Sequence, residues 1–367
     1  MEPLSNIPGG MRYYFGREAR LRRAAEDAAM TVFGGWGYEE IATPSVDYYA
    51  LFERGMGRVE ARRSFRFTDT DGRLLALRPD VTSSVARAAA TLFSGAPRPL
   101  RFCYAASVFS QRTRSHAEWK RQGRQVGCEL IGAGGADADL EVLAVAAEVL
   151  ERLGLGGAYR VTLNHAGVFN GVAEQLGLDA EAREEMRLLV DARDAAALEE
   201  FLRGLGRSGA TAGRAGRLAR LACAGGVPEG ARELLTNERS RAALEELGAL
   251  RAVVESLGLG ESFSVDLADV SGLDYYTGLV FKVYAEGAGA RVGGGGRYDE
   301  LTANFGRREP AVGFVLELDA LAELLARRDL AAGEEEARPA EVAGRCAAER
   351  FREARRRRAR GERVRLG

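Results

Sequence analysis

The order in which strand and helix patterns follow one another constrains the fold of this chain more than any other feature. Strand-like patterns occupy residues 38–42, 64–77, 100–109, 123–131, 158–164, 263–270, 277–285 and 312–318. Helical patterns occupy residues 17–33, 81–93, 137–154 and 320–328. In parallel sheets built from βαβ units, a crossover helix joins each strand to the next. Because several strands here follow one another without a helix, the pattern predicts an α+β protein with a mixed, mostly antiparallel sheet flanked by helices.

The helical stretch in the second half of the chain indicates a discontinuous core. Residues 171–260 show only helical periodicity, which is broken at glycines such as Gly177 and Gly204. We therefore expect a core formed by residues 1–170 and 261–328, with residues 171–260 as an inserted helical subdomain. Residues 329–367 form a short polar segment with one helix and a strand at 362–366, which is too little for a stable α/β domain.

Composition excludes several classes of function. The net charge of −1 gives no overall field for nucleic acid or an anionic membrane, and no apolar run is long enough for a membrane-spanning helix. The cysteines form no CxxC pair, and they lie far apart at Cys103, Cys128, Cys223 and Cys346. This usage predicts a reduced, cytoplasmic protein without a structural zinc site. Neither His116 nor His165 has a partner at metal-ligand spacing, so we assign no metal and no catalytic role to them.

Two segments contain side chains suited to a small cationic ligand. The segment Arg78–Thr82 ends a predicted hairpin and opens a helix, so Asp80 and Thr82 can accept hydrogen bonds from an ammonium group. The alternative interpretation is a helix N-cap. In the second segment, strand alternation from Gln125 places Glu129 on the same face. An imidazole plus an ammonium would satisfy these two buried polar groups, although a salt bridge to a neighbouring arginine would do so as well.

A tyrosine pair and a glycine run complete the set of candidate site elements. Tyr275 and Tyr276 follow the sequence Val270-Ser271-Gly272-Leu273-Asp274. The run Gly293–Gly296 precedes Arg297-Tyr298-Asp299 and lacks the Lys-Ser/Thr of a phosphate loop. We therefore interpret these glycines as sites of close backbone approach between strands and over a pocket.

Together these segments resemble the catalytic domain of histidyl-tRNA synthetases, which are class II aminoacyl-tRNA synthetases. Residues 270–278 resemble "RGLDYY", residues 78–82 resemble "RPEGT", residues 121–132 resemble the second half of motif 2, and residues 293–299 resemble "GGRYD". The resemblance covers about residues 7–328. It implies a pocket for histidine formed by Asp80, Thr82, Gln125, Glu129, Tyr275 and Tyr276, with Val81, Ser110 and Ser271 as weaker candidates.

The departures from this family affect the groups that activate the amino acid. The motif 2, tyrosine-motif and motif 3 arginines are replaced by Ser110, Ser271 and Ala320. The aromatic residue that stacks on adenine is replaced by Gly123, and a motif 3 glycine by Glu317. Loss of one electrostatic contact of this kind typically costs about a hundred- to a thousandfold in rate. We therefore expect no adenylate formation, no catalytic residues and no cofactor.

The chain is identified as a member of the noncatalytic paralogues of this synthetase, the regulatory subunits of ATP phosphoribosyltransferase. That resemblance implies a short-form catalytic subunit as partner, histidine as feedback effector in histidine biosynthesis, and a homodimer within a hetero-octamer. Pro44 matches the motif 1 proline of the class II dimer interface. The anticodon-binding domain is not expected, and neither is tRNA binding. The alternatives are a catalytic histidyl-tRNA synthetase and a stand-alone histidine sensor or RNA-binding module.

Overall fold

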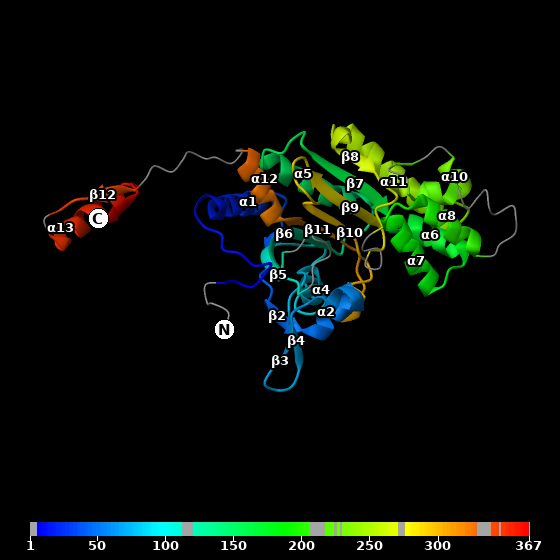
Figure 1. Cartoon of the computed structure of the whole chain (residues 1–367), viewed down its shortest axis with the longest axis horizontal. Coiled ribbons are helices and arrows are strands. Elements are labelled where there is room, and N and C mark those ends of the chain that lie inside the picture. Colours follow the sequence, from blue (N-terminus) through cyan, green and yellow to red (C-terminus); the bar gives the residue numbers. More distant parts are fainter. Residues whose placement is uncertain are drawn as a thin grey trace.

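The computed structural model describes residues 6–111, 120–205, 217–223, 226–227, 230–270, 276–328, 339–344 and 346–366. Its centre is an eight-stranded sheet with the order β1-β5-β6-β11-β10-β9-β7-β8 (Figure 1). The bounds are β1 Glu39–Glu40, β5 Leu100–Phe109, β6 Gln122–Ile131, β7 Tyr159–His165, β8 Phe263–Val265, β9 Leu279–Ala285, β10 Gly293–Arg297 and β11 Ala311–Glu317. Only the edge pairs β1–β5 and β7–β8 are parallel. The predicted mixed, mostly antiparallel sheet is therefore confirmed.

Three helices cover one face of this sheet: α1 (Gly16–Gly35), α5 (Ala136–Arg152) and α12 (Leu318–Arg328). In α1, Leu21, Ala25, Ala29 and Val32 recur at helical spacing, and all four are buried. They pack in the main core with sheet residues such as Phe314. The apolar face that the sequence indicates thus lies against the sheet, while the opposite face of the sheet is left for other elements.

The opposite face carries a smaller layer that includes the predicted hairpin. Its sheet has the order β2-β4-β3, with β2 Val46–Tyr48, β3 Arg66–Thr68 and β4 Leu74–Leu77. The helices of this layer are α2 (Tyr49–Met56), α3 (Arg58–Ala61), α4 (Thr82–Ala90) and the short η3 (Thr302–Phe305). Val81, Val85 and Ala89 pack against Phe102 and Tyr104 of β5 in a second core. This packing places the start of α4 directly over the central strands.

The inserted region is helical, as predicted. It contains α6 (Ala166–Leu176), α7 (Ala180–Asp191), α8 (Ala195–Gly204), α10 (Ala231–Leu234) and α11 (Glu238–Ser256), and the short η2 (Gly260–Ser262) follows. The carboxylates of Asp179 and Asp194 and the amide oxygen of Asn237 accept N-cap hydrogen bonds at three of these helices. The first helix starts at Ala166, before residue 171, and its buried side chains belong to the main core. The boundaries of the subdomain remain a prediction.

Two strand predictions were too long, and three strands were missed, namely β2, the glycine-rich β10 and β12. The predicted strand 263–270 ends at Val265, because the side chain of Asn164 donates to the carbonyls of Leu267 and Asp269 and closes a turn. The predicted strand 38–42 is reduced to β1. In the C-terminal segment, β12 (Ala340–Val342) pairs with β13 (Val364–Leu366) on either side of α13 (Ala347–Ala359). The strand β12 was not predicted, because three residues carry too little periodicity.

Candidate functional site

A buried carboxylate on the central strand β6 forms the centre of the candidate site. Glu129 is 1% exposed, and it lies on the sheet face opposite to the α1–α5–α12 layer. Its Oε1 accepts hydrogen bonds from the Thr82 hydroxyl at 2.7 Å and from the Tyr104 hydroxyl at 3.1 Å. The Tyr298 hydroxyl donates to Oε2. These residues, together with Asp80, are called the Glu129 cluster below.

Two glycines make room for this cluster. Gly313 lies opposite Glu129 in the sheet, and a Cβ atom there would come within 1.9 Å of Glu129 Oε2. Gly127 lies opposite Tyr104, and a Cβ atom there would lie 2.8 Å from the tyrosine hydroxyl. A larger residue at Gly313 would displace the carboxylate itself, and one at Gly127 would displace the Tyr104 hydroxyl that binds it. The glycines of motifs 2 and 3 therefore have a steric role at this site.

Asp80 brings a second carboxylate close to Glu129. It immediately precedes the start of α4, and its Oδ2 accepts a hydrogen bond from the Ser83 hydroxyl at 3.0 Å. Its Oδ1 is buried without a hydrogen-bond partner among the described residues. The helix N-cap itself is Val81, which makes no side-chain cap and is 1% exposed. Asp80 is therefore only partly explained as a helix-capping residue, and one oxygen remains available to a ligand.

Burial controls the electrostatics of both carboxylates. Desolvation raises the pKa of Glu129 to about 7, although hydrogen bonds from Tyr298, Thr82 and Tyr104 oppose the shift. Desolvation also raises the pKa of Asp80 to about 6. Within the described part of the chain no arginine or lysine forms an ion pair with either group. The site therefore holds two acids without a protein cation, which is the arrangement that an ammonium or imidazole ligand would neutralise.

The other predicted residue of β6, Gln125, lies on the same face but has a different partner. Its amide donates to Glu317 Oε1 at 2.8 Å. Asp319, two residues further on, forms an ion pair with Arg22 at 2.6 Å and accepts the backbone N–H of Arg124 at 3.1 Å. Gln125, Glu317 and Asp319 are called the Glu317 end below. Gly123, where the resemblance places an adenine-stacking aromatic residue, lies beside this end, since a Cβ atom there would be 3.8 Å from Glu317 and 4.0 Å from Asp319.

The tyrosine motif is described only from its second tyrosine onward. Ser271 and Tyr275 lie outside the described residues, whereas the ring of Tyr276 is close to Gly296 and packs against both cores. Ser110 follows β5, and its backbone N–H donates to the carbonyl of Arg121 at 2.9 Å. The structure thus brings Asp80, Val81, Thr82 and Glu129 together and places Gln125 further along the same face.

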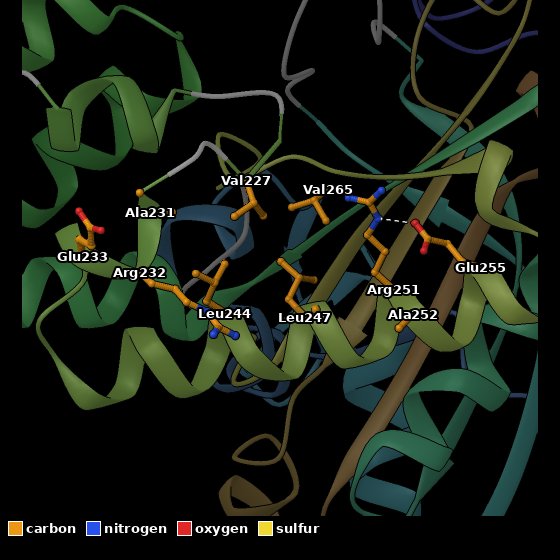
Figure 2. A pocket seen from close by; sticks show the side chains of 12 residues that line it. Val227, Ala231, Arg232, Glu233, Leu244, Leu247, Arg251, Ala252, Glu255 and Val265 are labelled. Carbon is orange, nitrogen blue, oxygen red and sulfur yellow. Dashed lines mark hydrogen bonds and ion pairs between the residues drawn. The ribbon is translucent and has the colours of Figure 1, made fainter.

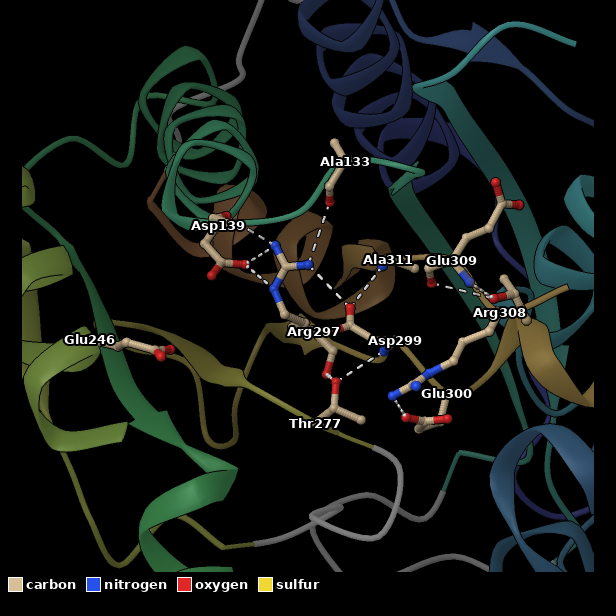
Figure 3. A network of polar contacts seen from close by, with 12 residues as sticks. Ala133, Asp139, Glu246, Thr277, Arg297, Asp299, Glu300, Arg308, Glu309 and Ala311 are labelled. Atoms are coloured by element: carbon tan, nitrogen blue, oxygen red, sulfur yellow. Dashed lines mark hydrogen bonds and ion pairs between the residues drawn. The ribbon is translucent and has the colours of Figure 1, made fainter. Parts of the chain in front are cut away.

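Arg297 of the glycine-rich element binds several surrounding residues, including Thr277, which follows Tyr276 in the sequence (Figure 3). Its guanidinium donates to Asp139 Oδ1 from Nη2 at 2.8 Å and to Asp299 from Nη1 at 3.2 Å. Its carbonyl accepts the backbone N–H of Thr277 at 2.7 Å. The network fixes β10 and the start of β9 to the beginning of α5. The network gives Arg297 and Asp299 a structural role, and Cβ atoms at Gly293 and Gly295 would lie 2.5 Å and 2.2 Å from carbonyl oxygens of the neighbouring strand.

Sequence reasoning missed two members of the cluster, Tyr104 and Tyr298. Tyr298 is part of the "GGRYD" element, in which the sequence pattern indicates a role for the glycines but none for the tyrosine hydroxyl. Tyr104 is signalled only by its pairing with Gly127, and a register between strands is not visible in the sequence. Both side chains are nearly fully buried, at 1% and 2% exposure. A buried tyrosine hydroxyl requires a partner, which Glu129 provides.

A cavity of about 630 Å³ lies away from this cluster, along α11 (Figure 2). Its lining combines apolar side chains such as Leu244 and Leu247 with Arg251 and Glu255, which form an ion pair with each other. It therefore lacks the buried, cation-free carboxylates of the Glu129 cluster. Among the described residues no group of His, Cys, Asp and Glu side chains is arranged to hold a metal ion. In the same part of the chain no helix is long and apolar enough to span a membrane.

Comparison with known proteins agrees with this geometry. The sequence profile of the histidyl-tRNA synthetase family matches residues 10–321. The ATP phosphoribosyltransferase regulatory subunit of Symbiobacterium thermophilum is 38% identical over 320 residues, which are 86% of this chain and 79% of the relative. That of Moorella thermoacetica is 36% identical over 338 residues, which are 92% and 84% of the two chains.

Solved structures show the same fold. A Bacillus halodurans C structure, described as an ATP phosphoribosyltransferase regulatory subunit/histidyl-tRNA synthetase, superposes with a TM-score of 0.85 at 30% identity, and it covers 99% of this chain and 92% of the other. Histidyl-tRNA synthetase from Nostoc sp. PCC 7120 gives a TM-score of 0.77 at 21% identity over 99% and 86% of the two chains. The second likeness supports the class II fold alone.

Proposed function

The chain belongs to the ATP phosphoribosyltransferase regulatory subunit family, and we propose that it binds histidine at the Glu129 cluster and regulates a separate catalytic subunit. The role of regulatory subunit follows the name shared by its relatives. Histidine as the effector, the cluster as its site and the short-form catalytic chain as the partner are our proposals. They place the protein in the first step of histidine biosynthesis, in the cytoplasm.

The observation that carries the proposal is the pair of buried acids to which none of the described residues supplies a cation. Asp80 offers an unpartnered oxygen at the start of α4, and Glu129 lies below it with three hydroxyl groups around it. An α-ammonium group fits the first acid, and an imidazole N–H fits the second. Leaving two such groups buried and unmatched is costly, so a ligand that matches both gains affinity and specificity.

Three features support a role without catalysis. Ser110, Ala320 and Ser271 stand where the synthetase family has cations, and Glu317, which replaces a glycine of that family, adds negative charge to the same end of the sheet. A nucleotide triphosphate would meet this added carboxylate and would find no arginine at those three positions. Repulsion and lost stabilisation of the phosphates both disfavour adenylate formation. The chain therefore binds its amino acid without activating it.

Assembly is the remaining part of the proposal. The outer face of the β2–β4–β3 sheet exposes apolar side chains, including Val46, Tyr48 and Phe67. Apolar side chains grouped on one sheet face are typical of interaction surfaces. We propose that this face, next to Pro44, forms a homodimer, and that two dimers join four catalytic chains in a hetero-octamer. Binding of tRNA is not part of the proposed role.

The test uses three ligands and one partner. In calorimetry with the full chain, histidine and histidinol should both bind, because the carboxylate has no cation in the Glu129 cluster. Imidazolepropionate lacks the ammonium group and should bind at least about tenfold more weakly, since Asp80 stays unmatched. A short-form ATP phosphoribosyltransferase mixed with this chain should coelute on a sizing column and show histidine-sensitive product formation. Histidine binding without complex formation or any rate change would favour the stand-alone sensor instead.

A further inference from the structure

A short buried turn leads from strand β8 to the tyrosine motif. The backbone N–H of Asp266 donates to the carbonyl of Leu163 at 2.9 Å, and the Asp266 carboxylate accepts the N–H of Ala268 at 3.1 Å. The amide of Asn164 donates to the carbonyls of Leu267 at 3.2 Å and Asp269 at 3.0 Å. Strand β7 therefore holds the backbone of the turn Asp266–Val270 at several points.

One lysine holds the side chain at the end of this turn. Asp269 is 4% exposed, and its carboxylate accepts the Thr162 hydroxyl at 3.1 Å and forms an ion pair with the ammonium of Lys282. The Lys282 side chain is only 14% exposed. Thr162 and Lys282 are directly paired neighbours on β7 and β9, so both point to the same face of the sheet. The ion pair thus ties the turn to two strands at once.

This face of the sheet is the one that carries the Glu129 cluster. In the sheet register Lys282 is paired with Gly294, Gly294 with Val315, and Val315 with Gly127, two residues before Glu129. In sequence the turn is followed by Ser271–Tyr275, the predicted pocket wall. Beyond that wall, Arg297 holds the backbone of Thr277. The ammonium of Lys282 therefore fixes the chain shortly before the tyrosine motif, and the backbone carbonyl of Arg297 fixes it directly after Tyr276.

We propose that Lys282 is a positioning residue for the histidine site, which acts by holding the turn Asp266–Val270 through its ion pair with Asp269. The proposal rests on the proposed function, because it concerns the same site. Lys282 itself does not touch the Glu129 cluster. Its removal leaves a buried carboxylate without a counter-ion, and such a group draws in water or moves toward it. Either response displaces the residues that lead into the tyrosine motif and weakens the ligand site.

Lys282→Met, Lys282→Arg and the double variant Lys282→Met/Asp269→Asn form the test set, with Arg98→Met as the matched control. Arg98 forms an ion pair with Glu309, and the two side chains are 14% and 6% exposed, close to the values for Lys282 and Asp269. Lys282→Met should lower histidine affinity by about tenfold, within the usual range of coupling between sites. Lys282→Arg should restore most of it. Arg98→Met should lose thermal stability but keep its affinity.

The pH profile separates positioning from general stability. Burial lowers the pKa of Lys282 to about 8, so its ammonium is lost as the pH rises through that value. The charges that act on Lys282 are Asp269, Asp266, Asp191, Arg193 and Arg291. Wild-type affinity should fall above about pH 8, and the fall should be smaller in Lys282→Arg, because a guanidinium does not titrate there. The ligand amino group titrates equally in both proteins, so the difference reports Lys282.

The outcomes separate two proposals: that the chain binds histidine, and that Lys282 positions the binding site. If wild type fails to bind histidine, the proposed function falls. If wild type binds and the folded Lys282→Met protein binds equally well with an unchanged pH profile, Lys282 is only structural and the inference is overturned. Should Lys282→Met fail to fold, the double variant gives the answer, since it removes both charges. The double variant buries no unpaired charge but still lacks the link between the turn and strand β9. Low affinity in that folded variant therefore supports positioning through the link, and full affinity contradicts it.

Discussion

Pairs of carboxylates lie near the two ends of strand β6, and the two pairs differ in whether the described residues supply a counter-ion. At the Glu129 cluster, Glu129 and Asp80 are buried among hydroxyl groups, and the described residues provide no cation for them. At the Glu317 end, Asp319 is paired with Arg22, and Glu317 accepts the amide of Gln125. At the first end a ligand could supply the counter-ion that the described residues do not provide. At the other end side chains of the protein already bind both carboxylates.

Under the proposed function, this difference is what would let a synthetase fold bind histidine without activating it. A cationic amino acid ligand needs only acids and hydroxyls, which the first end retains. Adenylate formation needs cations around the phosphates, and the second end now holds Glu317, bound by the amide of Gln125, and Asp319, paired with Arg22. Both ends use the same sheet. The fold alone therefore does not determine whether such a protein is catalytic, which depends on the charged residues at a few positions.

The largest expected effect concerns the Glu317 end. The full chain should show no histidine-dependent ATP–pyrophosphate exchange, because three cation positions are lost and each typically contributes about a hundred- to a thousandfold. The measurement is radiolabelled pyrophosphate exchange, with a bacterial histidyl-tRNA synthetase assayed in parallel. Exchange above about one-thousandth of the synthetase rate, the cost of a single lost contact, would show that this end still handles ATP.

The next effect compares one carboxylate from each end. Glu129→Gln keeps the shape of the side chain but removes its charge, and we expect histidine binding to weaken by about 1.5–3 kcal/mol, as for hydrogen bonds to charged groups. Glu317→Gln, at the other end of the same face, should change binding by less than about 0.5 kcal/mol. Calorimetry on both variants measures the contrast. Equal losses would mean that the ligand spans both ends.

The smallest effect is the pH dependence of binding. Burial raises the pKa of Glu129 to about 7 and that of Asp80 to about 6, so both acids take up protons as the pH falls from 8 to 5. An ammonium ligand needs the ionised acids, and affinity should therefore fall on acidification, by up to about tenfold per pH unit for each proton that must leave. Glu129→Gln should show a shallower profile although the ligand titrates identically. A wild-type profile that is flat or rises on acidification would contradict the assignment.

Much of the fold could be predicted because it depends on local patterns. Apolar residues at helical spacing located α1, and alternation with an Asp-Gly turn located the β3–β4 hairpin. Alternation through Phe263–Leu267 predicts a strand that continues to Val270, whereas the structure has a turn at Asp266–Val270. Contacts from Asn164 and Lys282, distant in sequence, gave the segment its actual conformation. Tertiary contacts overrode a weak local signal there.

The site was predictable in part for the same reason. Asp80, Thr82 and Glu129 were found from motifs, since acids and hydroxyls at the start of a helix and on a central strand stand out in a sequence. Tyr104 was not found, because nothing local distinguishes it from other buried aromatic residues. Its role follows from its position opposite Gly127 in the sheet. Strand register is a property of two segments, so neither segment alone reveals it.

The sequence by itself determined the order of strands and helices, the acids available for a ligand and the absence of the expected arginines at Ser110 and Ala320. Only the tertiary structure determined which of these acids form an ion pair with an arginine and which accept hydrogen bonds from hydroxyl groups. Asp319 meets Arg22 only because α1 packs beside α12, while Glu129 meets three hydroxyls because α4 packs over the sheet and Tyr104 of β5 and Tyr298 after β10 lie on the same sheet face. Charge is local to a residue, but its neutralisation depends on groups that only folding brings within a few ångströms.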